Sequence, residues 1–296
     1  MKLAISNIAW SREQDAAVAE LLKEAGIGGI EIAPTKIWPN PLAATDAEID
    51  EYRQFWSERE IAIVAAQALL FGKPELTIFE TASTREQTIE YLAGIVRICA
   101  RLGAGSLVFG SPKNRRVGTM PADEGSRIAV EFFTRLGEIA ANAGTCVVME
   151  ANPPIYGADF ITHAAEAIAL VERVNHPGFQ LHLDTGCVTL AGDSIPATFD
   201  EAFPLLRHFH VSEPNLDAPG TSGTVDHAVF AEQLRERRYM GWVSLEMREG
   251  HPFDRASFRD SVSWFEQCYG RDAAAISVRG MHGSQPEEMP VPRWER

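Results

Sequence analysis

Short runs of consecutive apolar residues alternate along the chain with longer segments whose apolar residues recur every three or four positions. Runs of the first kind are typical of strands in a parallel sheet, and segments of the second kind are typical of helices with one buried face. We therefore expect strands at 2–10, 29–34, 61–67, 106–112, 146–152, 179–184, 206–212 and 242–247. We expect helices at 13–25, 46–59, 84–102, 123–143, 162–174, 226–238 and 254–269. The segment 185–204 is only weakly helical and predicts a loop with one short helix.

Residues that cap helix N-termini support these boundaries. Thr45, Ser83 and Asp226 each precede an expected helix, and the side-chain oxygen of such a residue can accept a bond from a free N–H of the first turn. Glu48 follows Thr45 by three residues, which is the spacing of a capping box.

Eight strands that alternate with helices predict an α/β protein, and the leading architecture is a single closed (β/α)8 barrel over residues 1–270. A doubly wound open sheet is the competing architecture. It normally carries a glycine-rich phosphate loop after an early strand, and the sequence contains no such loop. Residues 271–296 are polar and rich in proline, and we expect a C-terminal tail that is disordered or packs on a neighbouring subunit.

Composition and charge narrow the classes of function. The 296-residue chain has a formal net charge of −14, which disfavours binding to nucleic acid or to an anionic membrane. The N-terminal residues lack the pattern of a signal peptide, and no apolar stretch is long enough to span a membrane. The four cysteines form no C-x-x-C pair and are interpreted as buried thiols, so we expect a cytoplasmic protein.

Four of the expected strands end in a residue type that binds metals: Glu150, Asp184, His210 and Glu246. Roughly 25–36 residues separate them, which is the length of one strand–helix unit. Because an unpaired buried charge costs several kcal/mol, such residues at the ends of apolar strands point to chemistry. Three carboxylates and one imidazole suit Mn²⁺, Mg²⁺, Co²⁺ or Zn²⁺, and we expect Mn²⁺ first. The alternative is a set of ordinary ion pairs at strand ends.

Other polar residues near the same strand ends have two possible roles. His182 and His208 each precede a ligand candidate by two positions and share its face, so they either contact substrate or metal ligands or are hydrogen-bonded core histidines. Glu31, near the end of an earlier strand, either binds substrate or pairs with a Lys or Arg. His227 and His251 are expected at the rim without a role.

The loop 110–116 gathers Lys113, Arg115 and Arg116. These cations either bind a phosphate or carboxylate of the substrate or are solvated loop charges, and the second interpretation is slightly favoured. Three aromatic residues fall in the first three strand–helix loops and either stack on a sugar or pack in the core: Trp10, Trp38 and Phe71.

The ligand pattern resembles the xylose-isomerase-like superfamily of sugar isomerases and epimerases, over about residues 1–270. The most specific part is the segment 208–247, in which a strand with His210 is followed by an acidic stretch, a Pro-Gly loop, a helix and the strand that ends in Glu246. The resemblance implies that Glu150, Asp184, His210 and Glu246 bind one divalent ion. It also implies that this ion acidifies a sugar C–H beside a carbonyl, with Glu150 and Glu246 moving the proton through an enediolate.

The chain departs from that family pattern at two positions. Epimerases of the group usually have a His three residues after the strand-six Asp, where this chain has Cys187, and an Arg six residues after the strand-seven His, where it has Leu216. Both family residues contact substrate oxygens, so the resemblance places Cys187 against the substrate and predicts a changed substrate or reaction.

Three functions remain open from the sequence. The first is a metal-dependent isomerase or epimerase that acts on a ketose, keto-sugar or related polyol. The second is a lyase or dehydratase that uses the same site for β-elimination. The third, an enzyme similar to endonuclease IV, is disfavoured by the eight histidines and the charge of −14. The family is often dimeric or tetrameric, and the sequence leaves the oligomeric state open.

Overall fold

The computed structural model describes residues 1–250 and 253–270. Eight parallel strands follow one another in sequence order around a closed barrel, which confirms the expected architecture. The strands are β1 (Lys2–Ser6), β2 (Gly29–Ile32), β3 (Ala62–Ala66), β4 (Ser106–Phe109), β5 (Val147–Met149), β6 (Phe179–Asp184), β7 (Leu206–Ser212) and β8 (Trp242–Glu246). Pairing of β1 with β8 closes the ring.

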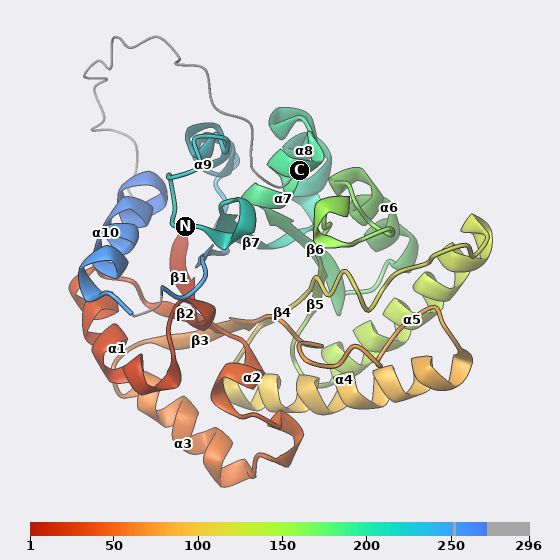
Figure 1. The fold of residues 1–296 in the computed structure, drawn as a ribbon, viewed down its shortest axis with the longest axis horizontal. Helices are drawn as coiled ribbons and strands as arrows, with labels where there is room; N and C mark the ends of the chain where they lie inside the picture. The colour runs from red at the N-terminus through yellow and green to blue at the C-terminus, as the bar shows by residue number, and fades with distance from the viewer. Residues whose placement is uncertain (251–252, 271–296) are drawn as a thin grey trace, which may run out of the picture.

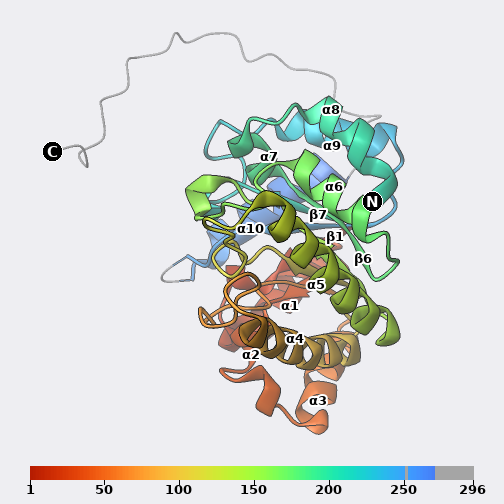
Figure 2. The ribbon, with the colours of Figure 1, turned by 90° about the vertical axis from the view of Figure 1, so that its right-hand side faces the viewer.

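Helices surround the strands (Figures 1 and 2). The longer ones are α1 (Asp15–Glu24), α3 (Asp46–Ser57), α4 (Ala82–Leu102), α5 (Ala122–Asn142), α6 (Ala164–Val174), α7 (Thr185–Ala191), α8 (Ile195–Ala202), α9 (His227–Glu236) and α10 (Arg255–Phe265). The short turns are α2 (Pro34–Ile37), η1 (Asn7–Ala9), η2 (Arg12–Gln14), η3 (Pro41–Ala43), η4 (Pro154–Tyr156), η5 (Phe203–Leu205), η6 (Pro214–Leu216) and η7 (Glu266–Gly270). An ion pair of 3.2 Å between Arg259 of α10 and Glu24 of α1 joins the last helix to the first.

Most expected element boundaries hold within a few residues, and two expectations are wrong. The crossover 185–204 forms two helices, α7 and α8, because the Asp184 side chain caps the first and Pro196 is placed in the first turn of the second. Thr81 caps α4 in place of Ser83, whereas Thr45 and Asp226 cap their helices as expected. His251 and the tail 271–296 lie outside the described residues.

Alternate side chains along each strand face the helices or the barrel interior. The outward set is apolar and packs with the helices in one core, as in the case of Ile5, Ile30, Phe109, Leu183 and Val243. The inward set is small or polar and still buried, and includes Ala4, Ser6, His182, His208 and Ser244. The barrel interior is therefore polar near its centre, where a large aliphatic filling is usual.

No helix in the described part of the chain is long and apolar enough to cross a membrane. The residue-270 domain boundary, the cytoplasmic location and the oligomeric state stay predictions.

Candidate metal centre and active-site cavity

The four ligand candidates meet at the carboxyl end of the barrel. Asp184 and Glu246 are the last residues of β6 and β8, Glu150 directly follows β5, and His210 lies in β7 opposite Asp184. One ligand atom from each residue lies within 4.8 Å of the others. None of the four side chains forms an ion pair with a Lys or Arg among residues 1–250 and 253–270, and the close charged partners of the cluster are its own members, His182 and Glu31.

Unpartnered atoms in the cluster fit a divalent cation. His210 Nδ1 and Asp184 Oδ2 are buried and have no hydrogen-bond partner. His210 Nδ1 lies 3.3 Å from Glu246 Oε2 and 3.9 Å from Glu150 Oε1. Three carboxylates and one imidazole are a donor set for Mn²⁺, Mg²⁺, Co²⁺ or Zn²⁺. Because orphaned buried polar atoms are costly, this arrangement is suited to hold an ion.

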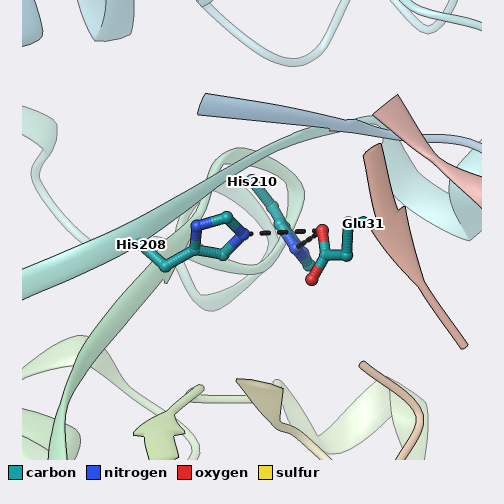
Figure 3. A group of neighbouring side chains, drawn as sticks. All are labelled: Glu31, His208 and His210. Atoms are coloured by element: carbon teal, nitrogen blue, oxygen red, sulfur yellow. Dashed lines mark hydrogen bonds and ion pairs between the residues drawn. The ribbon is translucent and has the colours of Figure 1, made fainter. Parts of the chain in front are cut away.

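Glu31 of β2 fixes the orientation of His210 (Figure 3). Its Oε2 lies 2.7 Å from His210 Nε2 and 3.5 Å from His208 Nε2, and the side chain is fully buried. When His210 donates its Nε2–H to Glu31, its Nδ1 lone pair faces the cluster, which is the arrangement of a carboxylate behind a metal-binding histidine. Pairing of Glu31 with a Lys or Arg, one of the two sequence interpretations, is therefore wrong.

Burial and charge shift the pKa values of the cluster. Burial, together with the neighbouring Glu150 and Glu246 carboxylates, raises the pKa of Asp184 to about 7. Burial also raises the pKa values of Glu150 and Glu246, although His210 opposes both shifts. Burial alone lowers the pKa of His210, but Glu31 and Glu246 outweigh it and raise that pKa well above its usual value. The metal-free cluster therefore holds protons that a cation must displace.

The other two histidines of the barrel interior contact the cluster. His182 Nε2 lies 3.5 Å from Glu150 Oε1, and its ring packs edge-on against His210 at 4.2 Å. Burial and the nearby imidazoles hold the pKa of His182 well below its usual value, so the ring is neutral. His208 contacts Glu31, which in turn contacts His210 of the cluster. Neither ring lines the cavity described next, so their substrate-binding role stays a prediction.

A cavity of about 420 Å³ opens beside the cluster and is lined by both glutamates. The Glu150 and Glu246 side chains are each 12% exposed, whereas Asp184 is 3% exposed and His210 is fully buried behind them. The lining also includes Gln67, Phe71, Lys73 and Lys113. Of the aromatic candidates, Phe71 is 68% exposed and lines this cavity, while Trp10 and Trp38 are buried in the core.

Cys187 lies beneath the cluster and does not line this cavity. Its backbone N–H donates to Asp184 Oδ1 at 2.6 Å, and its Sγ lies 3.7 Å from Asn152 Nδ2. Burial raises the pKa of the thiol well above its usual value. The expected substrate contact of Cys187 stays a prediction. At Leu216 the backbone adopts a φ of +57°, and its carbonyl accepts a bond from Arg248 N–H.

The interpretation of the loop 110–116 as carrying solvated charges is wrong for Arg115. It is fully buried, and its guanidinium donates to the backbone oxygens of Gly110, Glu150, Phe160 and Ile161 and to Asn152 Oδ1. Asn152 in turn donates from Nδ2 to Glu150 Oε2 at 2.7 Å. Gly110 leaves space for Glu150 Oε2, because a Cβ at position 110 would collide with that oxygen.

Sequence reasoning missed Asn152, although its place two residues after Glu150 puts it on the same side of the chain. It also placed His227 at the rim. His227 is buried, with Nε2 3.1 Å from Glu213 Oε1 and Nδ1 2.8 Å from the Tyr269 hydroxyl. This contact anchors the loop after β7, because Glu213 also accepts from Gly220 N–H.

We expect Asn152→Leu to weaken metal binding by about 10–100-fold, because Glu150 loses the donor that orients its carboxylate. The free energy of unfolding should fall by about 1–3 kcal/mol, since Arg115 keeps a buried unpaired N–H. Titration calorimetry well below the melting temperature measures the first effect, and thermal unfolding measures the second. Asn142→Leu, at an exposed helix end, is the control and should change neither metal affinity nor stability appreciably. Unchanged metal affinity in Asn152→Leu would show that the amide has only a structural role.

Comparison with known proteins identifies the family of the chain. A family model described as "Xylose isomerase-like TIM barrel" matches residues 19–268. The chain belongs to this family. An L-ribulose 3-epimerase from Methylomonas sp. (strain DH-1) is 25% identical over 244 residues, which cover 81% of this chain and 82% of the relative. A 3-dehydro-D-guloside 4-epimerase from Escherichia coli (strain K12) is 31% identical over 149 residues, which cover 49% of this chain and 55% of the relative.

Among solved structures, a D-psicose 3-epimerase from Clostridium cellulolyticum H10 superposes with a TM-score of 0.75 at 18% identity and covers 91% of this chain and 99% of its own. At that identity the superposition establishes the barrel fold of the family. The family match and the sequence relatives together support an enzyme of the isomerase or epimerase type.

Proposed function

We propose that this family member is a divalent-metal-dependent isomerase or epimerase of a ketose, keto-sugar or related polyol. The observation that carries the proposal is the position of the two glutamates. Glu150 and Glu246 line the cavity, whereas Asp184 and His210 lie behind them. Two carboxylates that face a substrate cavity from different strands can act as acid and base, while the deeper pair completes the ligand set.

The bound ion, with Mn²⁺ proposed first among Mn²⁺, Mg²⁺, Co²⁺ and Zn²⁺, supplies Lewis-acid polarisation of the substrate carbonyl and adjacent hydroxyl. One glutamate removes the proton from the carbon between them, and the other returns a proton to the opposite face or to the neighbouring carbon.

The two glutamates differ in the partners of their carboxylate oxygens. Asn152 holds Glu150 through Oε2. Glu246 Oε2 faces His210 Nδ1, and its Oε1 has no hydrogen bond within the described ranges. His182, kept neutral by burial, contacts Glu150 Oε1 without adding a positive charge that would favour the ionised carboxylate.

The proposal is tested by incubating the Mn²⁺-loaded protein with a panel of ketoses and keto-polyols in D₂O. We expect deuterium on the reacting carbon of an epimerised product or on the neighbouring carbon of an isomerised one, detected by NMR. A chelator-treated sample is the control and should incorporate none.

Two results would contradict the proposal. Loss of water or of another leaving group from the substrate would identify a lyase that uses the same carboxylates. Cleavage of abasic DNA without exchange on any sugar would identify a nuclease.

A further inference from the structure

Three cations on the loop 110–116 have different environments. Arg115 is buried and bonded to backbone oxygens around β5. Arg116 Nε lies 3.7 Å from Asp159 Oδ2. Lys113 has no carboxylate within 4 Å among the residues that the structure describes, and it lines the cavity that contains Glu150 and Glu246. Its aliphatic stem lies beside Gly157, where a Cβ would be 3.8 Å from Lys113 Cγ.

The wall that carries Lys113 is built from two loops held together by Asn114. The buried Asn114 amide donates to the backbone oxygens of Lys73 at 2.7 Å and of Leu76 at 2.8 Å. The Ile78 N–H donates to the backbone carbonyl oxygen of Asn114 at 3.0 Å. Because Asn114 and Arg115 are both fixed, the backbone of Lys113 is held at the cavity wall.

Lys73 supplies a second cation to this wall. It lines the same cavity, and its Nζ lies 5.6 Å from the centre of the Tyr91 ring. It also has no carboxylate within 4 Å in the described part of the chain. Apart from these two lysines, the charged residues that line the cavity are Glu150 and Glu246. The cavity thus combines the two glutamates of the metal cluster with two lysines from neighbouring loops, although the whole chain has a net charge of −14.

We propose that the substrate is an anionic keto-sugar, whose carboxylate or phosphate binds Lys113 and Lys73 while its carbonyl faces Glu150 and Glu246. The inference rests on the proposed function and narrows its substrate class. An anionic group gains charge-assisted hydrogen bonds from both ammonium groups, and these are stronger than the bonds that a neutral hydroxyl can form. A neutral ketose offers neither lysine a negative charge.

The test compares a neutral ketohexose, D-fructose, with two anionic counterparts, D-fructose 6-phosphate and D-fructuronate, in the same D₂O exchange assay. We expect the wild-type enzyme to exchange at least one anionic compound with a kcat/KM about 100-fold above that of D-fructose. The phosphate and carboxylate arms show which anion the wall accepts. Lys113→Gln should raise KM for that compound about tenfold, with little change in kcat or in exchange of D-fructose.

Arg116→Gln is the matched control. It removes one positive charge from the same loop, three residues from Lys113, but Arg116 does not line the cavity. We expect its KM values to equal those of the wild-type enzyme. Equal effects of Lys113→Gln and Arg116→Gln would overturn the inference, because general charge loss would then explain both.

A second measurement does not need turnover. Inorganic phosphate, titrated into the protein and followed by calorimetry, should bind the wild type and Arg116→Gln, and should bind the double variant Lys73→Gln/Lys113→Gln at least tenfold more weakly. If the double variant still binds phosphate, or if the wild-type enzyme prefers D-fructose, the proposal of an anionic substrate is wrong. The proposed function is not affected by either result. Loss of phosphate binding in the double variant, with no exchange on any sugar of the wider panel, contradicts the proposed function and leaves the anion site intact.

Discussion

Glu246→Gln is expected to lower the rate of substrate deuterium exchange at saturating metal by about 10²–10⁴-fold, because an amide cannot take up or return the proton. Metal affinity should also fall, since Glu246 belongs to the cluster whose ligand atoms lie within 4.8 Å of one another. Exchange measured over a range of Mn²⁺ concentrations separates the two effects. Excess metal restores binding but leaves the missing proton acceptor unreplaced.

Glu249→Gln is the matched control for this experiment. Glu249 is a mostly buried carboxylate three residues away, it pairs with Lys36 at 2.8 Å, and it lies outside the cluster. Its substitution should leave metal affinity and exchange within about twofold of the wild type. Full exchange by Glu246→Gln at saturating Mn²⁺ would remove Glu246 from the mechanism and leave Glu150 to be tested by the same substitution.

Metal affinity is expected to rise with pH up to about 7, because the ion displaces protons from the cluster. Burial raises the pKa of Asp184 to about 7 and also raises the pKa values of Glu150 and Glu246. An acid whose pKa is higher in the folded than in the unfolded protein stabilises the fold at pH values below its unfolded pKa. That stabilisation is lost as the pH rises through the folded pKa. The three carboxyl groups should therefore reduce the stability of the metal-free barrel as the pH rises from about 4 to about 7. His210, whose pKa is raised, continues this loss above its usual pKa, whereas His182 and His208, whose pKa values are lowered, contribute in the opposite sense below theirs.

A bound cation replaces these protons, so the metal-loaded protein should not show this loss of stability with rising pH. At a metal concentration 100 times Kd we expect about 2.7 kcal/mol of stabilisation. Below pH 7, affinity should fall by up to tenfold per pH unit for each displaced proton. The measurements are thermal unfolding with Mn²⁺ or with chelator from pH 5 to pH 8, and calorimetry in two buffers of different ionisation enthalpy to count released protons.

Asp184→Asn is the control for the pH effect, because it removes the carboxyl group whose pKa lies near 7. Its metal affinity should be lower and should depend less on pH in the same range. An affinity of the wild-type protein that does not change between pH 5 and pH 7 would contradict the assignment of these groups as ligands.

The alternation of strands and helices was predictable from the sequence because both element types repeat with a short period. Their apolar outward residues, such as Phe109 and Val243, are determined by that local pattern. The crossover 185–204 was less predictable. Its first helix begins because the Asp184 side chain accepts a bond from the Cys187 N–H, so one residue serves both as a cap and as part of the cluster.

The candidate site was partly predictable for the same reason. Parallel strands in a closed barrel place all their carboxyl ends on one rim, so Glu150, Asp184, His210 and Glu246 could be grouped from strand order alone. The role of Glu31 could not be read this way, because 179 residues separate it from His210 and the two meet only across the barrel interior. A sequence pattern does not measure distances across a barrel.

The sequence by itself determined the barrel, its strand order and the residue types at the strand ends, because hydrophobic periodicity and chain connectivity act locally. Only the tertiary structure decided which charges are buried and which remain free. Arg115 and Lys113 lie two positions apart in one loop, yet the first is surrounded by backbone oxygens of its own loop and of the segment after β5, and the second lines the cavity. That difference depends on how residues distant in the chain pack together, because the solvation and hydrogen-bond partners of a charge are set by its neighbours in space.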